Sequence, residues 1–410
     1  MAETRIVLTH CTLIDPTDIA TYTRRDGFAA LTKARTLGPD GVIAQINASG
    51  LRGRGGAGFP CAAKWALARA SSRTETSSGT ETYLICNADE GEVGTFKDRY
   101  ILEHDPFSLI EGIAIAAYAI GAKKAYIYLR GEYHYLHDRL RTAIDQATTH
   151  DFLPGLAITI QEGAGAYICG EESALMNSIE GKRGEARFRP PFPPTHGLFG
   201  KPTVINNVET LMNIPSIIAR GPAWFAAIGT PESTGTKVFS VAGDVERPGV
   251  YELPMGTPLT HLLEFAGARD IKLVQVGGAG GRILPAALVN TPLSFETVLG
   301  SGGITVCNAT RDVIDVVYRC VEFLHEESCG LCTPCREGTE VMMEIMTRLT
   351  RGDGVPEDLT TLADLARTMM DASLCGLGQA APIPVLDTLT HFRHDYETRI
   401  AQSVYLRALR

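Results

Sequence analysis

Four cysteines near the C-terminus constrain this chain more than any other feature of its sequence. Cys329, Cys332 and Cys335 lie in the segment SCGLCTPCR, and Cys375 follows much later in SLCGLGQAAP. Three thiolates at C-x2-C-x2-C spacing can surround one face of a cubane iron–sulfur cluster, and a distant fourth completes its ligation. A four-cysteine zinc site is the nearest alternative, although it normally uses two separated C-x2-C pairs. Disulfides are a weaker alternative because the spacing is crowded, so the pattern favours a [4Fe-4S] cluster.

Composition narrows the class of protein further. The 410 residues are 44% hydrophobic and 21% charged, which suits a globular chain of roughly two to four domains. The net charge of −9 argues against a nucleic-acid surface. The start MAETR lacks the apolar core of a signal peptide, so we expect a cytoplasmic protein with reduced cysteines. The most apolar stretch, 109–129, is interrupted by charges and glycines, which predicts a buried helix and strand and no membrane span.

The chain divides into four regions that differ in their expected secondary structure. Residues 1–60 form a leader with a helical stretch at 26–35, and residues 61–230 alternate strands with helices, which predicts a wound, largely parallel sheet. Residues 235–307 resemble a small α+β module, and residues 311–410 a helical bundle whose loops bring the four cysteines to one end. The expected strands are 83–87, 125–129, 156–160, 237–242, 249–253 and 273–276; the expected helices are 106–120, 132–147, 311–327, 336–350, 357–371 and 383–409; and 70–81 is expected to be a surface loop.

A glycine-rich loop, LRGRGGAGF at 51–59, precedes a helix-like run. Glycines let the backbone approach a phosphate, and a helix N-terminus supplies free N–H groups. The spacing is not the dinucleotide fingerprint G-x-G-x-x-G, so a plain turn stays open as the alternative. Arg52, Arg54 and Lys64 favour an anion site.

Two acidic loops follow apolar strands, at 86–92 and 163–172. Carboxylates at the carboxyl ends of parallel strands lie where open α/β sheets bind ligands. They can accept hydrogen bonds from ribose hydroxyls and repel a 2′-phosphate, which favours NAD(H) over NADP(H). A solvated acidic turn is the alternative for either loop taken alone.

Read together, these segments resemble a family of flavin-bearing, NADH-binding proteins shared by respiratory complex I, NAD-linked hydrogenases and NAD-linked formate dehydrogenases. The motifs that carry the resemblance span residues 50–382 in family order. They are GLRGRGGAGFP, CNADEGEVGTFKDR, GAGAYICGEESAL, RPPFPPTHGLFGKPTVINNVET, ESCGLCTPCREGT and CGLGQAAP. The resemblance implies a Rossmann-like wound sheet that binds FMN, a ubiquitin-like β-grasp module at 235–307 and a four-helix bundle that carries the cluster at 311–410.

The resemblance also implies one FMN, one [4Fe-4S] cluster and a nicotinamide site stacked on the flavin. Hydride transfer to a flavin needs no general acid or base, so no residue is assigned as catalytic. Phe59 and Phe192 match the aromatics around the adenine of NADH, and Glu92 and Glu172 match its polar contacts. The remaining cofactor-binding positions implied are Gly53, Arg54, Gly55, Gly56, Lys64, Asn87, Asp89, Glu90, Tyr167, Gly170, Glu171, Arg189, Asn206, Asn207 and Thr210; the cluster ligands are Cys329, Cys332, Cys335 and Cys375.

Departures from the family pattern bear on the parent complex. Arg189 stands where complex I usually has Lys, and Leu67 where some relatives have Phe. The segment DEGEVG, the leader CTLIDP and the tail PIPVL favour a soluble formate dehydrogenase or hydrogenase, with complex I as the alternative. The remote alternative is a non-catalytic, cluster-stabilised assembly module.

The predicted partners follow from an incomplete electron path. A chain with one cluster needs an acceptor, so we expect a hetero-oligomer with a thioredoxin-like [2Fe-2S] subunit and a larger iron–sulfur subunit, with Arg336 at the seam. No nucleic acid and no direct membrane insertion are expected.

Overall fold

The computed structural model describes residues 3–74 and 81–408. Its first sheet contains β1 (Tyr83–Ala88), β2 (Lys124–Leu129), β3 (Ala157–Glu162) and β4 (Thr203–Asn207) in the order β3-β2-β1-β4. All three strand pairings are parallel, which confirms the predicted wound sheet. The strand β4 was not predicted from the sequence, because its segment TVINN ends in two polar residues.

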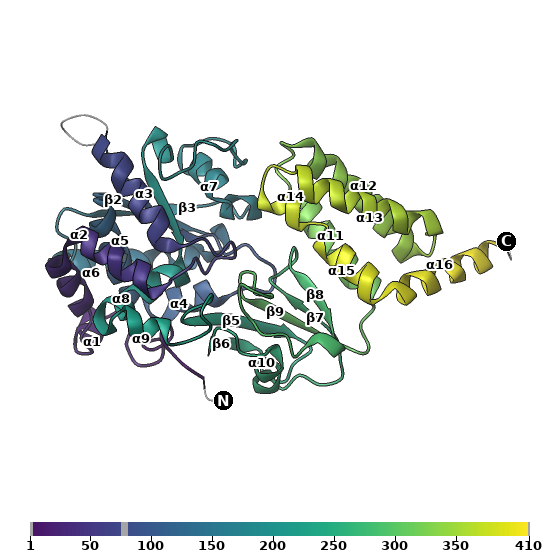
Figure 1. Ribbon diagram of the computed structural model, residues 1–410, viewed down its shortest axis with the longest axis horizontal. Coiled ribbons are helices and arrows are strands. Elements are labelled where there is room, and N and C mark those ends of the chain that lie inside the picture. The colour runs from purple at the N-terminus through teal and green to yellow at the C-terminus, as the bar shows by residue number, and fades with distance from the viewer. Residues whose placement is uncertain (1–2, 75–80, 409–410) are drawn as a thin grey trace.

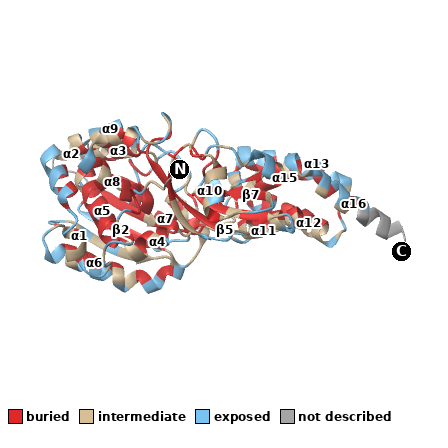
Figure 2. Ribbon diagram, turned by 90° about the horizontal axis from the view of Figure 1, so that it is seen from below, coloured by how far each residue is buried: buried red, intermediate tan, exposed pale blue. Residues whose placement is uncertain are grey.

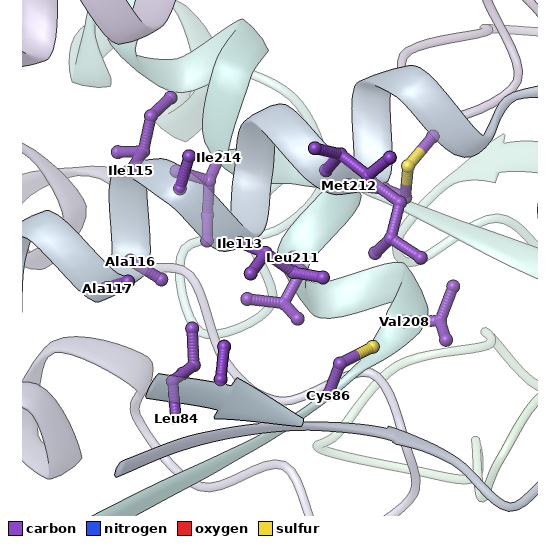
Figure 3. Close-up of a cluster of buried hydrophobic side chains, with 14 of the residues drawn as sticks. Leu84, Cys86, Ile113, Ile115, Ala116, Ala117, Val208, Leu211, Met212 and Ile214 are labelled. Atoms are coloured by element: carbon purple, nitrogen blue, oxygen red, sulfur yellow. The ribbon is translucent and has the colours of Figure 1, made fainter. Parts of the chain in front are cut away.

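Side-chain alternation gives the first sheet two buried faces. Leu84 and Cys86 point to one face and Tyr83 and Ile85 to the other. Figure 3 shows Leu84 and Cys86 directed at the helices α5 (Pro106–Ile120) and α8 (Val208–Arg220). The helix α5 is buried on nearly every side, as the red ribbon in Figure 2 shows. The predicted buried helix and strand at 109–129 are therefore confirmed.

Further helices surround this sheet. They are α1 (Ile19–Thr23), α2 (Ala29–Ser49), α3 (Cys61–Thr74), α4 (Lys97–His104), α6 (His137–Thr149), α7 (Glu172–Ile179) and α9 (Pro222–Ala226), with short 3-10 turns at Gly131–Leu136, Tyr167–Gly170 and Leu198–Gly200. The helices α2, α5 and α8 pack together on one face, and α7 belongs to the opposite core. The first sheet is thus covered on both sides.

Two predictions in the N-terminal part need correction. The helix expected at 26–35 begins at Ala29 and continues to Ser49, with a kink at Gly38 (φ 73°). The Gly38-Pro39 pair resembles a helix stop, but packing against α5 and α8 carries the helix past it. The surface loop expected at 70–81 is also partly wrong, because α3 extends to Thr74; positions 75–80 lie outside the described residues.

A second sheet lies beside the first (Figure 1). It contains β5 (Thr236–Gly243), β6 (Gly249–Pro254), β7 (Ile271–Val276), β8 (Arg282–Pro285) and β9 (Gly303–Asn308) in the order β6-β5-β9-β7-β8. Helix α10 (Leu259–Ala266) and a short turn at Ala286–Leu288 complete this five-stranded unit. The pair β5·β9 is parallel and the other pairs are antiparallel.

The C-terminal part is helical. It contains α11 (Val313–Glu326), α12 (Thr333–Arg351), α13 (Pro356–Ala372), α14 (Gly376–Ala380), α15 (Ile383–His391) and α16 (Arg393–Ala408). The single helix expected at 383–409 is wrong: it breaks at Phe392 (φ −131°, ψ 28°), whose ring packs into the core of these helices; position 409 lies outside the described residues. Over residues 3–74 and 81–408, no helix has the length and apolarity that a membrane crossing requires.

Candidate functional site

The four cysteines line one cavity, here called the cysteine cavity. Cys329 and Cys332 lie between α11 and α12, Cys335 lies in the first turn of α12, and Cys375 immediately precedes α14. All four thiols are free. The cavity's other lining residues are Ile168, Ala186, Ser328, Leu331, Leu374 and Leu377.

The spread of these thiols fits a cluster better than a single metal ion. Among the residues that the structure describes, no three Cys, His, Asp or Glu side chains converge closely enough to hold one ion. Zinc needs its ligands at one point, with each sulfur about 2.3 Å from the metal. In a cubane cluster each iron has its own cysteine, so the thiolates surround a volume. The cysteine cavity has this donor set.

Burial and local hydrogen bonds act in opposite directions on the thiols of this cavity. Burial raises the pKa of Cys335 to about 11 and also raises that of Cys375. Opposing this, the N–H groups of Leu377 and Gly378 donate to the sulfur of Cys375, which stabilises its thiolate and lowers its pKa. A Cβ at Gly378 would lie 2.8 Å from the Cβ of Cys335, so only glycine permits this approach. Metal binding would therefore displace thiol protons from a site already shaped to hold sulfur.

The glycine-rich loop, residues 53–58, forms what we call the glycine cradle. A Cβ added at Gly53 would find no protein atom closer than 3.7 Å, and its φ is not in the left-handed region. The protein's own packing therefore gives no reason for glycine at this position. Gly56 has comparable space, but its φ of 127° also favours glycine, and Gly55 lies against Asn207. Open glycines directly before the N-terminus of α3 provide the space and the N–H groups that a phosphate needs.

Arg54 is directed away from the cradle. Its guanidinium is 1% exposed and donates to the carbonyls of Arg52, Thr234 and Thr236. Burial lowers its pKa to about 10, so it remains charged at neutral pH. Its backbone N–H donates to the hydroxyl of Thr210 at 2.8 Å. Arg54 and Thr210 therefore fix the shape of the loop. The guanidinium of Arg54 already donates its hydrogen bonds to backbone carbonyls.

The first acidic loop supplies an unpartnered oxygen. Asn87 donates to the carbonyl of Gly170 at 2.9 Å and accepts from the N–H of Asp89 at 3.0 Å. The Oδ2 atom of Asp89 is buried and has no hydrogen-bond partner among the described residues. Burial is the main reason that the pKa of Asp89 rises to about 7. An orphaned carboxyl oxygen at the carboxyl end of β1 is the kind of group that a bound hydroxyl or ring N–H would satisfy.

Glu90 differs from its neighbour because the protein already satisfies it. One oxygen accepts from the N–H of Asp98 at 2.7 Å, and the other accepts from the N–H of Arg99 and the hydroxyl of Tyr133. Its carboxylate anchors the start of α4. Its flavin-binding role stays a prediction, and its side-chain contacts are structural.

Glu92 is held from two sides. It accepts from the hydroxyl of Tyr167 at 2.7 Å and from the N–H of Ala279 at 2.8 Å. Burial raises the pKa of Glu92. Ala279 lies between β7 and β8, so the second sheet reaches the site that the first sheet builds. Sequence reasoning missed Ala279, since nothing in a small apolar residue signals a backbone contact.

Glu172 pairs with two cations. Its carboxylate lies 3.1 Å from Lys64 Nζ and 3.2 Å from Arg189 Nη1. Glu171 has another task, because its carboxylate accepts from the N–H groups of Ser173 and Ala174 and so caps α7. The predicted acidic site is therefore partly neutralised by its own basic residues.

Aromatic faces are exposed nearby. Phe59 is 52% and Phe192 is 51% exposed, and Lys64 Nζ lies 5.6 Å from the ring centre of Phe59. Leu67 is 45% exposed. Large exposed apolar side chains around a cationic and acidic group suit a purine base, which would cover the rings and leave its sugar at the charges.

The end of β4 is held by a buried polar network. Asn206 accepts from the indole N–H of Trp65 at 2.9 Å. The amide of Asn207 donates to Asp98 at 2.7 Å and accepts from Lys97 at 3.3 Å. Trp65, Lys97 and Asp98 were missed by sequence reasoning, although the motif TFKDR pointed to the last two. These residues set the orientation of the two asparagines, of which Asn207 lies beside Gly55.

One turn connects the two sites. Within the turn Tyr167–Gly170, Tyr167 binds Glu92, whereas Ile168 lines the cysteine cavity. The N–H of Tyr167 also donates to Glu327, two residues before Cys329 in the chain. The glycine cradle, the acidic loops and the cysteine cavity are therefore parts of one continuous region.

Comparisons with known proteins agree with this arrangement. Residues 46–216 match the Nuo51 FMN-binding domain, residues 315–399 match the NADH-ubiquinone oxidoreductase-F iron-sulfur binding region, and residues 238–281 match the SLBB domain. The chain is 42% identical over 407 residues to a NADH-quinone oxidoreductase subunit of Rhizobium meliloti, covering 94% of each chain. It is 40% identical to NADP-reducing hydrogenase subunit HndC of Solidesulfovibrio fructosivorans, covering 97% of this chain and 84% of that one.

A solved structure gives the same result. The crystal structure of an NAD+-reducing [NiFe]-hydrogenase in the H2-reduced state matches with a TM-score of 0.84 and 44% identity. The match covers 88% of this chain and 62% of that chain, so the chain spans less than two thirds of that hydrogenase chain. Fold and site together define an oxidoreductase subunit with an FMN-binding domain and a [4Fe-4S]-binding region. The chain belongs to the family that contains these NADH-quinone oxidoreductase subunits and the related NAD(P)-reducing hydrogenase subunits.

Proposed function

We propose that this chain passes electrons between NAD(H) and partner iron–sulfur proteins through FMN and one [4Fe-4S] cluster. The observation that carries the proposal is the shared turn Tyr167–Gly170, which joins the acidic loops to the cysteine cavity. FMN can accept two electrons as a hydride and release them one at a time, which matches a nicotinamide donor to a cluster acceptor.

The residues divide the work of binding. Gly53 and Gly56 leave room for the FMN phosphate, and Asp89 offers the flavin an unpaired oxygen. Lys64, which pairs with Glu172, lies beside the exposed ring of Phe59, where the adenosine part of NADH would bind, with Phe192 as the second aromatic residue. No side chain is needed as general acid or base. Cys329, Cys332, Cys335 and Cys375 would hold the cluster.

We propose domain boundaries and finer folds that agree with this division. The leader and glycine-rich loop occupy 1–60 and the Rossmann-like FMN/NADH domain 61–230. The five-stranded unit, 235–307, is a β-grasp module, and a helical bundle, 311–410, carries the cluster. The match of residues 238–281 to the SLBB domain supports the third boundary.

The nucleotide preference follows from Glu92 and Glu172. We propose that their carboxylates favour NADH over NADPH, because a 2′-phosphate would meet negative charge. The two cations on Glu172 reduce that effect, so the preference is modest.

The parent complex we propose is a soluble NAD-dependent formate dehydrogenase or hydrogenase, with complex I as the alternative. Electrons would leave near the cysteine cavity, where Arg336 is half exposed and donates to the carbonyl of Gly330. The partners would be a thioredoxin-like [2Fe-2S] subunit and a larger iron–sulfur subunit.

Anaerobic purification of the natural assembly tests this proposal. We expect bound FMN, iron with equal labile sulfide, NADH:ferricyanide activity and co-purifying iron–sulfur subunits. A colourless protein that binds zinc and lacks flavin would instead support the assembly-module alternative, and proton-pumping membrane subunits would change the parent complex.

A further inference from the structure

The five-stranded unit buries its two faces against different parts of the protein. Along β7, Val274 and Val276 belong to the core that the unit shares with its own helix α10. Leu273, which points to the opposite face, belongs to the core of the C-terminal helices, together with Val317 of α11. This is the alternation expected of a strand that is buried on both sides. At β7, the second face of the sheet is therefore covered by the C-terminal helices.

Polar contacts fasten this second face. Gln275 donates to the sulfur of Cys320 in α11 at 3.0 Å. Asp387 of α15, which is 7% exposed, accepts from Arg282 Nε at 2.8 Å and from the N–H of Ile283 at 2.9 Å. In Figure 1, α15 lies beside the edge strand β8. One buried carboxylate thus joins α15, the second helix after Cys375, to the edge of the sheet.

The same unit also contacts the flavin side of the protein. Ser240 of β5 accepts from the N–H of Phe96 at 2.9 Å. Lys237 of β5 lies 2.6 Å from Glu209 of α8, and both side chains are fully buried. Ala279 donates to Glu92, as described above. The unit is therefore bound to both the flavin-binding loops and the C-terminal helices through buried polar groups.

We propose that the five-stranded unit is a positioning unit that fixes the cysteine cavity relative to the flavin site, with Asp387 as its positioning residue. The inference rests on the proposed function. Electron transfer between two centres slows steeply as their separation grows, so a unit that prevents movement of the helices sets the rate.

The variant Asp387→Ala tests the inference. We expect FMN content, cluster content, both midpoint potentials and flavin reduction by NADH to stay unchanged. Reduction of the cluster after the flavin should slow severalfold, because electron transfer falls off steeply as the distance between the two centres grows. Hydrogen exchange should rise in α15 and at the N–H of Ile283 in β8, which loses its acceptor. The matched control is Glu246→Ala, which breaks an exposed ion pair with Arg269 within the unit.

A second pair of variants covers the case in which Asp387→Ala does not fold. Leu273→Ala and Val274→Ala truncate adjacent, fully buried residues that face opposite sides of the same strand. We expect only Leu273→Ala to slow transfer to the cluster, while both lower the unfolding temperature. Equal transfer rates in both variants, with FMN and cluster fully bound, would overturn the inference. A wild-type protein that binds neither FMN nor the cluster would instead refute the proposed function.

Discussion

The cysteine cavity and the glycine cradle differ in how the chain builds them. The cavity takes its donors from two interhelical loops, and the donor atoms are the thiols themselves. The cradle depends on the absence of side chains at Gly53 and Gly56, and on carboxylates and amides from three other segments. Binding in the cavity therefore depends on which side chains are present, whereas binding in the cradle depends on the space left where side chains are absent. The two sites should therefore fail in different ways.

The largest effect is expected from Cys375→Ser. Loss of one thiolate leaves an iron without its cysteine, so the cluster should be lost while FMN stays bound, because the cradle shares no donor with the cavity. Iron analysis and flavin fluorescence measure both. The buried leader residue Cys11, changed to Ser, is the control. Loss of FMN together with the cluster would show that the two sites do not form separately.

The variant Gly53→Val should have the opposite effect, in which FMN binding weakens and the cluster stays bound. The Cβ of the added side chain would lie no closer than 3.7 Å to any protein atom, so the unfolding temperature should hardly change. It would fill space meant for a phosphate, and overpacking of this kind costs about 1–3 kcal/mol. Titration of the apoprotein with FMN should show that loss of affinity, with the cluster intact. Gly249→Val, also at an open position, is the control. Unchanged FMN affinity would remove the cradle from the flavin site.

A pH effect comes next in size. Burial raises the pKa of Asp89 from 3.8 to about 7, so the folded state favours its protonated form. This contribution to stability is fully present below about pH 4 and is lost as the pH rises through 7, on the order of 1–3 kcal/mol. Urea unfolding of flavin-free protein at pH 5 and pH 8 should show it. Asp89→Asn should be less sensitive to this change; equal pH sensitivity in both proteins would contradict the assignment.

The smallest effect concerns nucleotide choice. Glu172→Gln should raise kcat/KM for NADPH relative to NADH about fivefold, because a partly exposed carboxylate that already pairs with two cations contributes about 1 kcal/mol. Ferricyanide assays with both nucleotides measure the ratio. Glu162→Gln, on an acidic residue at the end of β3, serves as the control. An unchanged ratio would place the 2′-position away from Glu172.

The same contrast explains what the sequence could predict. Cysteine spacing and the alternation of strands and helices depend on local pattern, so the parallel sheet and the gathering of the cysteine loops followed from the sequence. The inward direction of the Arg54 side chain and the capping roles of Glu90 and Glu171 could not be predicted from the sequence. Each depends on contacts that no local pattern signals, as when Arg54 meets the distant carbonyl of Thr236. The backbone contact from Ala279 to Glu92 has no side-chain signal at all.

The break at Phe392 and the extension of α2 past Gly38 have the same cause. In both cases packing between elements overrides the local preference, in opposite directions. A partly buried aromatic residue, Phe392, lies where one helix ends in a segment with a continuous helical pattern. A helix–helix interface continues another helix through a Gly-Pro pair.

Anaerobic rapid mixing of the purified protein with NADH tests the central claim most directly. Flavin absorbance follows the first centre, and low-temperature electron paramagnetic resonance of frozen samples follows the second. The account predicts that the flavin is reduced first and that the signal of a reduced [4Fe-4S] cluster follows in the same protein. Flavin reduction without any cluster signal, in a protein whose cluster is reduced by dithionite, would contradict an electron path from the glycine cradle to the cysteine cavity.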